Sequence, residues 1–156
     1  TGWRLGYMGA PEWLAKACSK IQGQFTSGAT SFGQKAAADI LLSDKTEVHQ
    51  MKAAFLKRRD LILELLSDFP GIRLNVPEGA FYVLPDISYY FDKTHNEQTI
   101  KNSDDLSDYL LKEAHVAVVP GSAFGAEECI RISYASSEEN LKEASSRIKI
   151  ALKKLH

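Results

Sequence analysis

Arg131 is the residue of this 156-residue sequence whose setting points most directly to binding chemistry. It lies within residues 129–134, where alternation places Ile130, Ile132 and Tyr134 on one face of a predicted strand. A guanidinium among such strong strand formers is costly to bury unless an anion accompanies it. Two interpretations stay open: an arginine at a sheet edge or in a structural ion pair, and a planar clamp for a carboxylate.

A second arginine, Arg4, lies in the alternating stretch of residues 1–8, for which the sequence predicts a strand. Gly2 and Gly6 share its face, so a bulky group could approach the backbone beside the guanidinium. The alternative is a short edge strand with an exposed arginine. Both arginines are therefore candidates for binding an anion.

The composition excludes several classes of protein. The net charge of −1 gives no electrostatic reason to expect binding to nucleic acid or to a membrane, and Asp60 follows the basic run 57–59. Cys18 and Cys129 form neither a disulfide framework nor a metal motif, and the histidines lack ligand spacing. We therefore expect no metal site. Because the sequence shows no signal peptide and no bilayer-spanning run, we also expect a cytoplasmic protein.

The first half of the chain is predicted to be mainly helical. One helix is expected from Glu12 to about residue 25, and an alanine-rich helix over residues 32–42, with a loop of small residues 26–31 between them. The longest helix, residues 46–69, carries a single apolar stripe. Its length is on the order of 35 Å, enough to bridge two domains.

The second half alternates between strands and helices. Strands are predicted over residues 72–76, 80–84, 116–119 and 129–134, helices over 104–114 and from Ser137 onward, and a surface loop over 89–101. Ser103 and Ser137 are the predicted helix caps. The pattern predicts an α/β protein, in which a long helix over residues 46–71 joins residues 1–45 to a two-layer domain over residues 72–156.

A resemblance to a known family rests on five motifs in this order: TGWRLGY, FTSGATSFGQKAA, PEGAFYVLPD, VPGSAFG and RISYA. Together they resemble the C-terminal part of a fold-type I aminotransferase (class I/II) dependent on pyridoxal phosphate, of the aspartate aminotransferase type. The resemblance covers essentially the whole chain. It implies that residues 1–45 are the end of the large cofactor-binding domain and residues 72–156 the small domain. It also implies a homodimer, with the loop of residues 26–31 near the partner subunit.

The resemblance implies roles for four residues. Arg4 corresponds to the arginine that holds the phosphate of the cofactor, and Arg131 to the arginine that binds the α-carboxylate of the substrate. Gly79 and Phe81 would line the crevice near the substrate. The implied reaction moves an amino group between an amino acid, such as aspartate, and a 2-oxo acid.

The resemblance also predicts that this chain alone is inactive. In the family, the lysine that binds the cofactor covalently lies a few residues before the TGWR motif. Lys16, Lys20 and Lys35 lie on predicted helices, and none is nominated as its substitute. The alternative function is a non-catalytic α/β module that binds a carboxylate or forms a dimer. A nucleotide-binding domain is disfavoured because the sequence lacks both G-x-G-x-x-G and a P-loop.

A further expectation concerns the order of residues 1–45. Their apolar side chains, including Trp3, Tyr7 and Trp13, would normally pack against a sheet, and the predicted elements supply none in this region. We therefore expect this region to be less ordered than residues 72–156, or to be buried by another chain.

Overall fold

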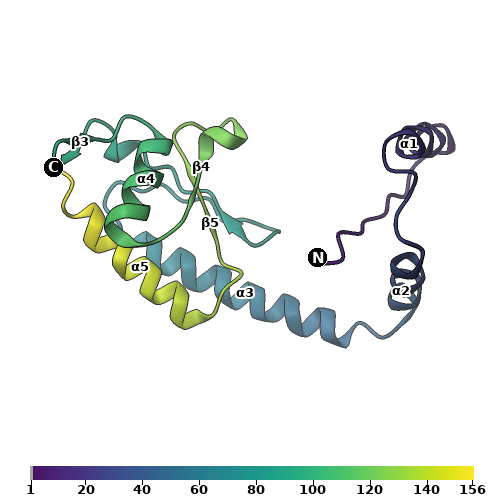
Figure 1. The fold of residues 1–156 in the computed structure, drawn as a ribbon. Helices are drawn as coiled ribbons and strands as arrows, with labels where there is room; N and C mark the ends of the chain where they lie inside the picture. Colours follow the sequence, from purple (N-terminus) through teal and green to yellow (C-terminus); the bar gives the residue numbers. More distant parts are fainter. Residues whose placement is uncertain (1) are drawn as a thin grey trace. The chain divides into compact units, whose positions relative to one another are not determined.

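The computed structural model describes residues 2–156 and divides into two compact units, Thr1–Val48 and His49–His156. The first unit contains helices α1 (Glu12–Phe25) and α2 (Ser31–Leu42), and helix α3 (Thr46–Ser67) begins at its end. The second unit contains the rest of α3, a small sheet, and helices α4 (Ser103–Ala114) and α5 (Glu138–Leu152) (Figure 1). Helices combined with small sheets confirm the predicted α/β class.

The sheet of the second unit has three short antiparallel strands in the order β1-β5-β4. The strands are β1 (Tyr82–Val83), β4 (Val119–Pro120) and β5 (Ile130–Ser133), so the strand that carries Arg131 is central. Tyr82 pairs with Ser133, and Val119 pairs with Arg131. The proline in β4 is tolerated because β4 is an edge strand and needs ladder hydrogen bonds on one side only.

The caps of α4 and α5 differ in how well the sequence predicted them. Ser137 caps α5 as expected, and its hydroxyl accepts a 3.2 Å hydrogen bond from the backbone N–H of Asn140. For α4 the prediction of Ser103 is wrong. Asn102 is the cap, and its side-chain oxygen accepts a 2.9 Å hydrogen bond from the N–H of Asp105. Ser103 is the first residue of the helix and is fully buried.

Three other local predictions were wrong. Residues 2–8 form no strand, because Arg4 has a φ of 55°, which breaks the extended backbone. The strand predicted over 72–76 is reduced to a single bridge between Arg73 and Asp86.

The predicted surface loop 89–101 contributes Tyr90 and Ile100 to the core, although Tyr89, Asn96 and Glu97 are exposed. It contains the end of a 3-10 helix (Ser88–Tyr90) and a hairpin of β2 (Thr94–His95) and β3 (Gln98–Thr99). Tyr90 is buried and its hydroxyl donates a 2.7 Å hydrogen bond to the carbonyl of Pro70, while Ile100 is also buried. Burial of these two side chains fixes a segment whose sequence has no clear period.

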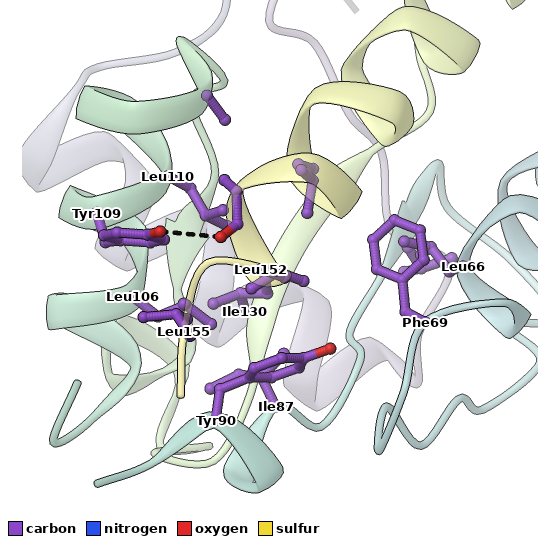
Figure 2. Packing of buried hydrophobic residues seen from close by; sticks show 14 of the residues in the cluster. Leu66, Phe69, Ile87, Tyr90, Leu106, Tyr109, Leu110, Ile130, Leu152 and Leu155 are labelled. Carbon is purple, nitrogen blue, oxygen red and sulfur yellow. Dashed lines mark hydrogen bonds between the residues drawn. The ribbon is translucent and has the colours of Figure 1, made fainter. Parts of the chain in front are cut away.

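The hydrophobic core lies in the second unit. It is built from α3, α4, α5, the sheet and the segment around Tyr90, and includes Leu66, Ile87, Leu106, Leu110, Ile130 and Leu152. Figure 2 shows side chains from these elements packed together, with the Tyr109 hydroxyl donating a 2.9 Å hydrogen bond to the carbonyl of Ala151. This bond joins α4 to α5 and satisfies the one polar group of a fully buried ring.

The first unit has little core of its own. Gly33 is the one buried residue among residues 2–48 of the structure, where the side chain of Leu5 packs against it. Trp13 is 71% exposed and Phe25 is 84% exposed. Among residues 2–156, no helix combines the length and apolar character needed to cross a membrane.

Candidate active site

Arg131 lies on the central strand, where residues from both sides of the sheet can reach it. Because Tyr82 pairs with Ser133, it is a diagonal neighbour of Arg131 on the same face of the sheet. The second neighbour, Phe124, belongs to the 3-10 helix η2 (Gly121–Phe124), which follows β4 on the other side of β5. The fold therefore gathers three side chains that come from three different elements.

Two aromatic rings contact the guanidinium of Arg131. Its central carbon, Cζ, lies 4.4 Å from the ring centroid of Tyr82 and 4.4 Å from that of Phe124. Both distances are within the range of a cation–π interaction. Within residues 2–156 Arg131 makes no ion pair. A half-buried cation with five N–H donors and no carboxylate partner is suited to binding an anionic ligand.

Gly79 and Phe81 lie in a turn whose backbone accepts a side-chain hydrogen bond on each side of Gly79. Arg59 donates a 3.3 Å hydrogen bond to the carbonyl of Pro77. The hydroxyl of Tyr134 donates a 3.1 Å hydrogen bond to the carbonyl of Ala80, whose φ of 60° lies in the left-handed region. These bonds hold a backbone conformation that alanine rarely adopts, so the turn has a fixed shape.

The two predicted residues of this turn differ in their surroundings. Phe81 is half-buried, with its ring 6.0 Å from that of Phe55 and 4.4 Å from that of Tyr82, which in turn contacts Arg131. Gly79 is exposed, and a Cβ built on it would meet no atom within 4 Å. The structure thus connects Phe81 to Arg131 through Tyr82, whereas nothing in the second unit requires glycine at position 79.

Burial raises the pKa of two nearby groups. It raises the pKa of the Tyr134 hydroxyl, an effect that the positive charge of Arg59 opposes. The shift further favours the protonated hydroxyl that donates to the carbonyl of Ala80. Burial, together with the negative charges of Asp86 and Glu128, also raises the pKa of the Cys129 thiol. Cys129 is consequently a poor candidate for a nucleophile.

Arg4 belongs to the first unit and is exposed. Its neighbours in sequence are anchored to α2: the ring of Trp3 lies 5.7 Å from that of Phe32, edge to face, and Leu5 packs against Gly33. No ion pair of Arg4 occurs among residues 2–156. Both sequence neighbours of Arg4 therefore contact α2, and the guanidinium itself is exposed and available to an anion.

The loop between α1 and α2 borders a cavity within the first unit. The cavity has a volume of about 500 Å³, and its mainly apolar lining includes Leu5, Tyr7 and Leu41 together with small and polar residues such as Gly6 and Ser27. Ser27 has a φ of 64°, and Gln34 donates a 2.7 Å hydrogen bond to the carbonyl of Ala29. The loop is shaped by these local contacts, and its place near a partner subunit remains a prediction.

The contacts of Tyr82 and Phe124 with Arg131 were not predicted from the sequence. The contact with Tyr82 could have been predicted only if the register of the two strands were known, because residues on one face of adjacent strands can then be paired. Register was not predictable from strands this short. Phe124 lies in the VPGSAFG motif, but its contact with Arg131 depends on the path of a 3-10 turn.

Known proteins match this chain over nearly its whole length. The family model for aminotransferase class I and II matches residues 1–148. The chain is 46% identical over 156 residues to "Bifunctional aspartate aminotransferase and glutamate/aspartate-prephenate aminotransferase" of Petunia hybrida, covering 97% of this chain and 33% of that protein. It is 46% identical over 157 residues to "Probable aspartate/prephenate aminotransferase" of Aquifex aeolicus (strain VF5), covering 99% of this chain and 38% of that protein.

A solved structure matches the fold as well. The crystal structure of the aspartate aminotransferase from Rhizobium meliloti superposes with a TM-score of 0.89 at 42% sequence identity, covering 99% of this chain and 39% of that one. The chain thus spans 33–39% of the length of these proteins.

Proposed function

The chain belongs to the aminotransferase class I and II family, and on that premise we propose that it is the C-terminal part of a longer aminotransferase, here called the parent protein. The parent moves an amino group between aspartate, or a similar amino acid, and a 2-oxo acid with the help of pyridoxal phosphate. The names of the relatives, aspartate and aspartate/prephenate aminotransferases, support this substrate class.

The observation that carries the proposal is the state of Arg131. Its guanidinium is half-buried, contacts two aromatic rings and has no acidic partner within residues 2–156. A structural ion pair, the alternative interpretation of this arginine, would have required a carboxylate nearby. In the proposed reaction Arg131 binds the α-carboxylate of the substrate through paired N–H donors and so orients the amino acid.

Arg4 fits the role of a phosphate-binding residue. Its side chain is exposed, and a Cβ built on Gly2 or Gly6 would meet no atom within 4 Å, so a bulky anion has room beside the backbone. We propose that Arg4 binds the phosphate of pyridoxal phosphate in the parent. The chemistry supplied by the bound cofactor is that of an electron sink for the carbon atom that loses or gains the amino group.

We further propose that the 156 residues alone do not transaminate. Lys16 and Lys35 are exposed and form ion pairs with Glu12 and Asp39, at 2.5 Å and 2.8 Å, on the surfaces of their helices. Lys20 is exposed as well. These are the settings of ordinary solvated lysines, whereas a covalent cofactor lysine needs a shielded amine of lowered pKa.

The parent is proposed to be a cytoplasmic homodimer. The exposed apolar side chains of the first unit, such as Phe25 and Leu42, support burial of this unit by other parts of the parent or by its partner subunit. The proposed cytoplasmic setting is the expectation from the sequence, and the free thiols of Cys18 and Cys129 are consistent with it.

Kinetics of the intact parent test the proposed function. Arg131→Lys keeps the charge but loses the planar fork, so kcat/KM for transfer from aspartate to a 2-oxo acid should fall about ten- to a hundredfold. Arg147→Lys is the matched control, since Arg147 pairs with Glu143 on the exposed surface of α5. Wild-type kcat/KM in Arg131→Lys, or an equal loss in Arg147→Lys, would overturn the proposal.

A further inference from the structure

We propose that Phe124, together with Tyr82, is a positioning residue that holds the guanidinium of Arg131 in the orientation needed to bind a carboxylate. This inference rests on the function proposed above and adds to it a residue that contacts the arginine rather than the reacting atoms. We call the two rings the aromatic cradle.

The geometry of the aromatic cradle limits where a ligand can bind. Both ring centroids lie 4.4 Å from the guanidinium carbon of Arg131, and the rings come from elements that flank β5 on opposite sides. The guanidinium N–H donors all point outward in its own plane. Cζ lies over both rings, and no side-chain hydrogen bond or ion pair of Arg131 occurs within residues 2–156, so these donors are available to a carboxylate, which accepts two parallel hydrogen bonds from a guanidinium edge.

Phe124 is held by its backbone rather than by the core. It is 50% exposed and does not belong to the apolar cluster of the second unit. The turn that carries it is fixed at Gly121, whose N–H donates a 2.8 Å hydrogen bond to the carbonyl of Cys129. A Cβ at position 121 would lie 2.0 Å from the carbonyl oxygen of Ala126, so only glycine fits there.

The start of α4 holds the same turn from its other side. The hydroxyl of Ser122 donates a 2.7 Å hydrogen bond to the carboxylate of Asp104, and the N–H of Ser122 donates a 3.4 Å hydrogen bond to the hydroxyl of Ser103. This explains why a serine that does not cap α4 is nevertheless fully buried. A half-exposed ring on such a rigid turn adds little to the core, and its defined contact is with Arg131.

The aromatic cradle predicts that carboxylate affinity depends on whether the side chain at position 124 is aromatic. Phe124→Leu keeps an apolar side chain but removes the π face, so the dissociation constant for a carboxylate should rise about three- to tenfold. Phe124→Tyr keeps the π face and should bind as the wild type does. Tyr89→Leu is the matched control, because Tyr89 is 49% exposed and its ring lies 4.4 Å from the ammonium of Lys93.

Two measurements test the inference. In the 156-residue chain, the Nε–H resonance of Arg131, assigned by its loss in Arg131→Lys, should be shifted upfield by the rings. Phe124→Leu should move this resonance downfield, whereas Phe124→Tyr and Tyr89→Leu should not. In the intact parent, maleate, a dicarboxylate without an amino group, should bind three- to tenfold more weakly to Phe124→Leu, as estimated above.

The outcomes separate this inference from the proposed function. An Arg131 resonance that is unshifted, or that ignores Phe124→Leu, would show that the aromatic cradle does not exist. Unchanged maleate affinity in Phe124→Leu, with weakened affinity in Arg131→Lys, would overturn the positioning role and leave the proposed function standing. Unchanged affinity in both variants would overturn both.

Discussion

The two units of this chain differ in how far they bury their own apolar side chains. The second unit, His49–His156, encloses a core in which Leu106 and Leu110 are inaccessible to solvent. The first unit, Thr1–Val48, has two well-formed helices whose large apolar side chains face solvent. The difference teaches that helix formation and tertiary stability are separate properties, and that only the second unit has the burial needed to fold independently.

The same contrast applies to the two candidate anion-binding arginines. Arg131 lies in surroundings that the second unit supplies by itself, namely two aromatic rings and a central strand. Arg4 is exposed on a unit with almost no core. We interpret the carboxylate site as preformed within this chain, and the phosphate site as one that the rest of the parent completes.

The largest expected effect is a difference in hydrogen exchange between the two units. Amides of α4 and α5 should exchange with a protection that reflects global unfolding, on the order of 5–15 kcal/mol. Amides of α1 and α2 should show little protection, because few buried contacts oppose their local opening. The measurement is hydrogen exchange of the 156-residue chain at a concentration where it is monomeric. Equal protection of the two units in a strict monomer would break the comparison.

A second prediction concerns two adjacent leucines of α4. Leu110 is 0% exposed and Leu111 is 52% exposed. Leu110→Ala should destabilise the second unit by about 2–5 kcal/mol, since it removes buried atoms and leaves a cavity. Leu111→Ala should change the free energy of unfolding by less than about 0.5 kcal/mol. Urea unfolding followed through the tyrosine signal of the second unit measures both, and similar losses in the two variants would contradict the assigned core.

A third, smaller effect should appear on acidification. Burial by itself would raise the pKa of Asp86, but hydrogen bonds from the N–H and hydroxyl of Ser88 and from Arg73 outweigh it, so the pKa lies below its ordinary value. A carboxyl with a lowered pKa in the folded state stabilises that state above the unfolded pKa of about 3.9, and this contribution is lost as the pH falls below it.

The variant Asp86→Asn isolates this effect. The stability difference between wild type and variant should be larger at pH 6 than at pH 3, as measured by urea unfolding of the second unit. A difference that stays constant across this range would show that the contacts of Asp86 with Ser88 and Arg73 do not control its protonation.

The sequence predicted the helices well because their signals are local. The Ser137 cap of α5 depends on residues within a few positions of each other. The apolar stripe predicted for α3 is also a local pattern, but only part of it is buried, since Val48 is 55% and Met51 60% exposed. Several failures involve contacts between distant segments, whereas the strand predicted over residues 1–8 fails because of the local backbone angle of Arg4. Tyr90 and Ile100 are buried in a segment predicted to be a surface loop, and Ser103, predicted as the cap of α4, is buried and accepts a hydrogen bond from the N–H of Ser122 in η2.

The candidate site shows the same difference between local sequence patterns and contacts that depend on the fold. The strand pattern was enough to single out Arg131, and the motifs supplied an expected ligand. The partners of Arg131 were not predictable, because Tyr82 reaches it through strand register and Phe124 through a turn fixed by Gly121. Neither relation leaves a short-range pattern in the sequence.

The central claim is that Arg131 and Arg4 divide two anions between them, and binding constants of the intact parent test it most directly. The measurement is the affinity for maleate and for pyridoxal phosphate in the wild type, Arg131→Lys and Arg4→Lys. We predict that Arg131→Lys weakens maleate binding about ten- to a hundredfold and leaves cofactor affinity unchanged, and that Arg4→Lys has weakened cofactor retention as its main defect. If Arg131→Lys instead releases the cofactor, or binds maleate as tightly as the wild type, the assignment is wrong.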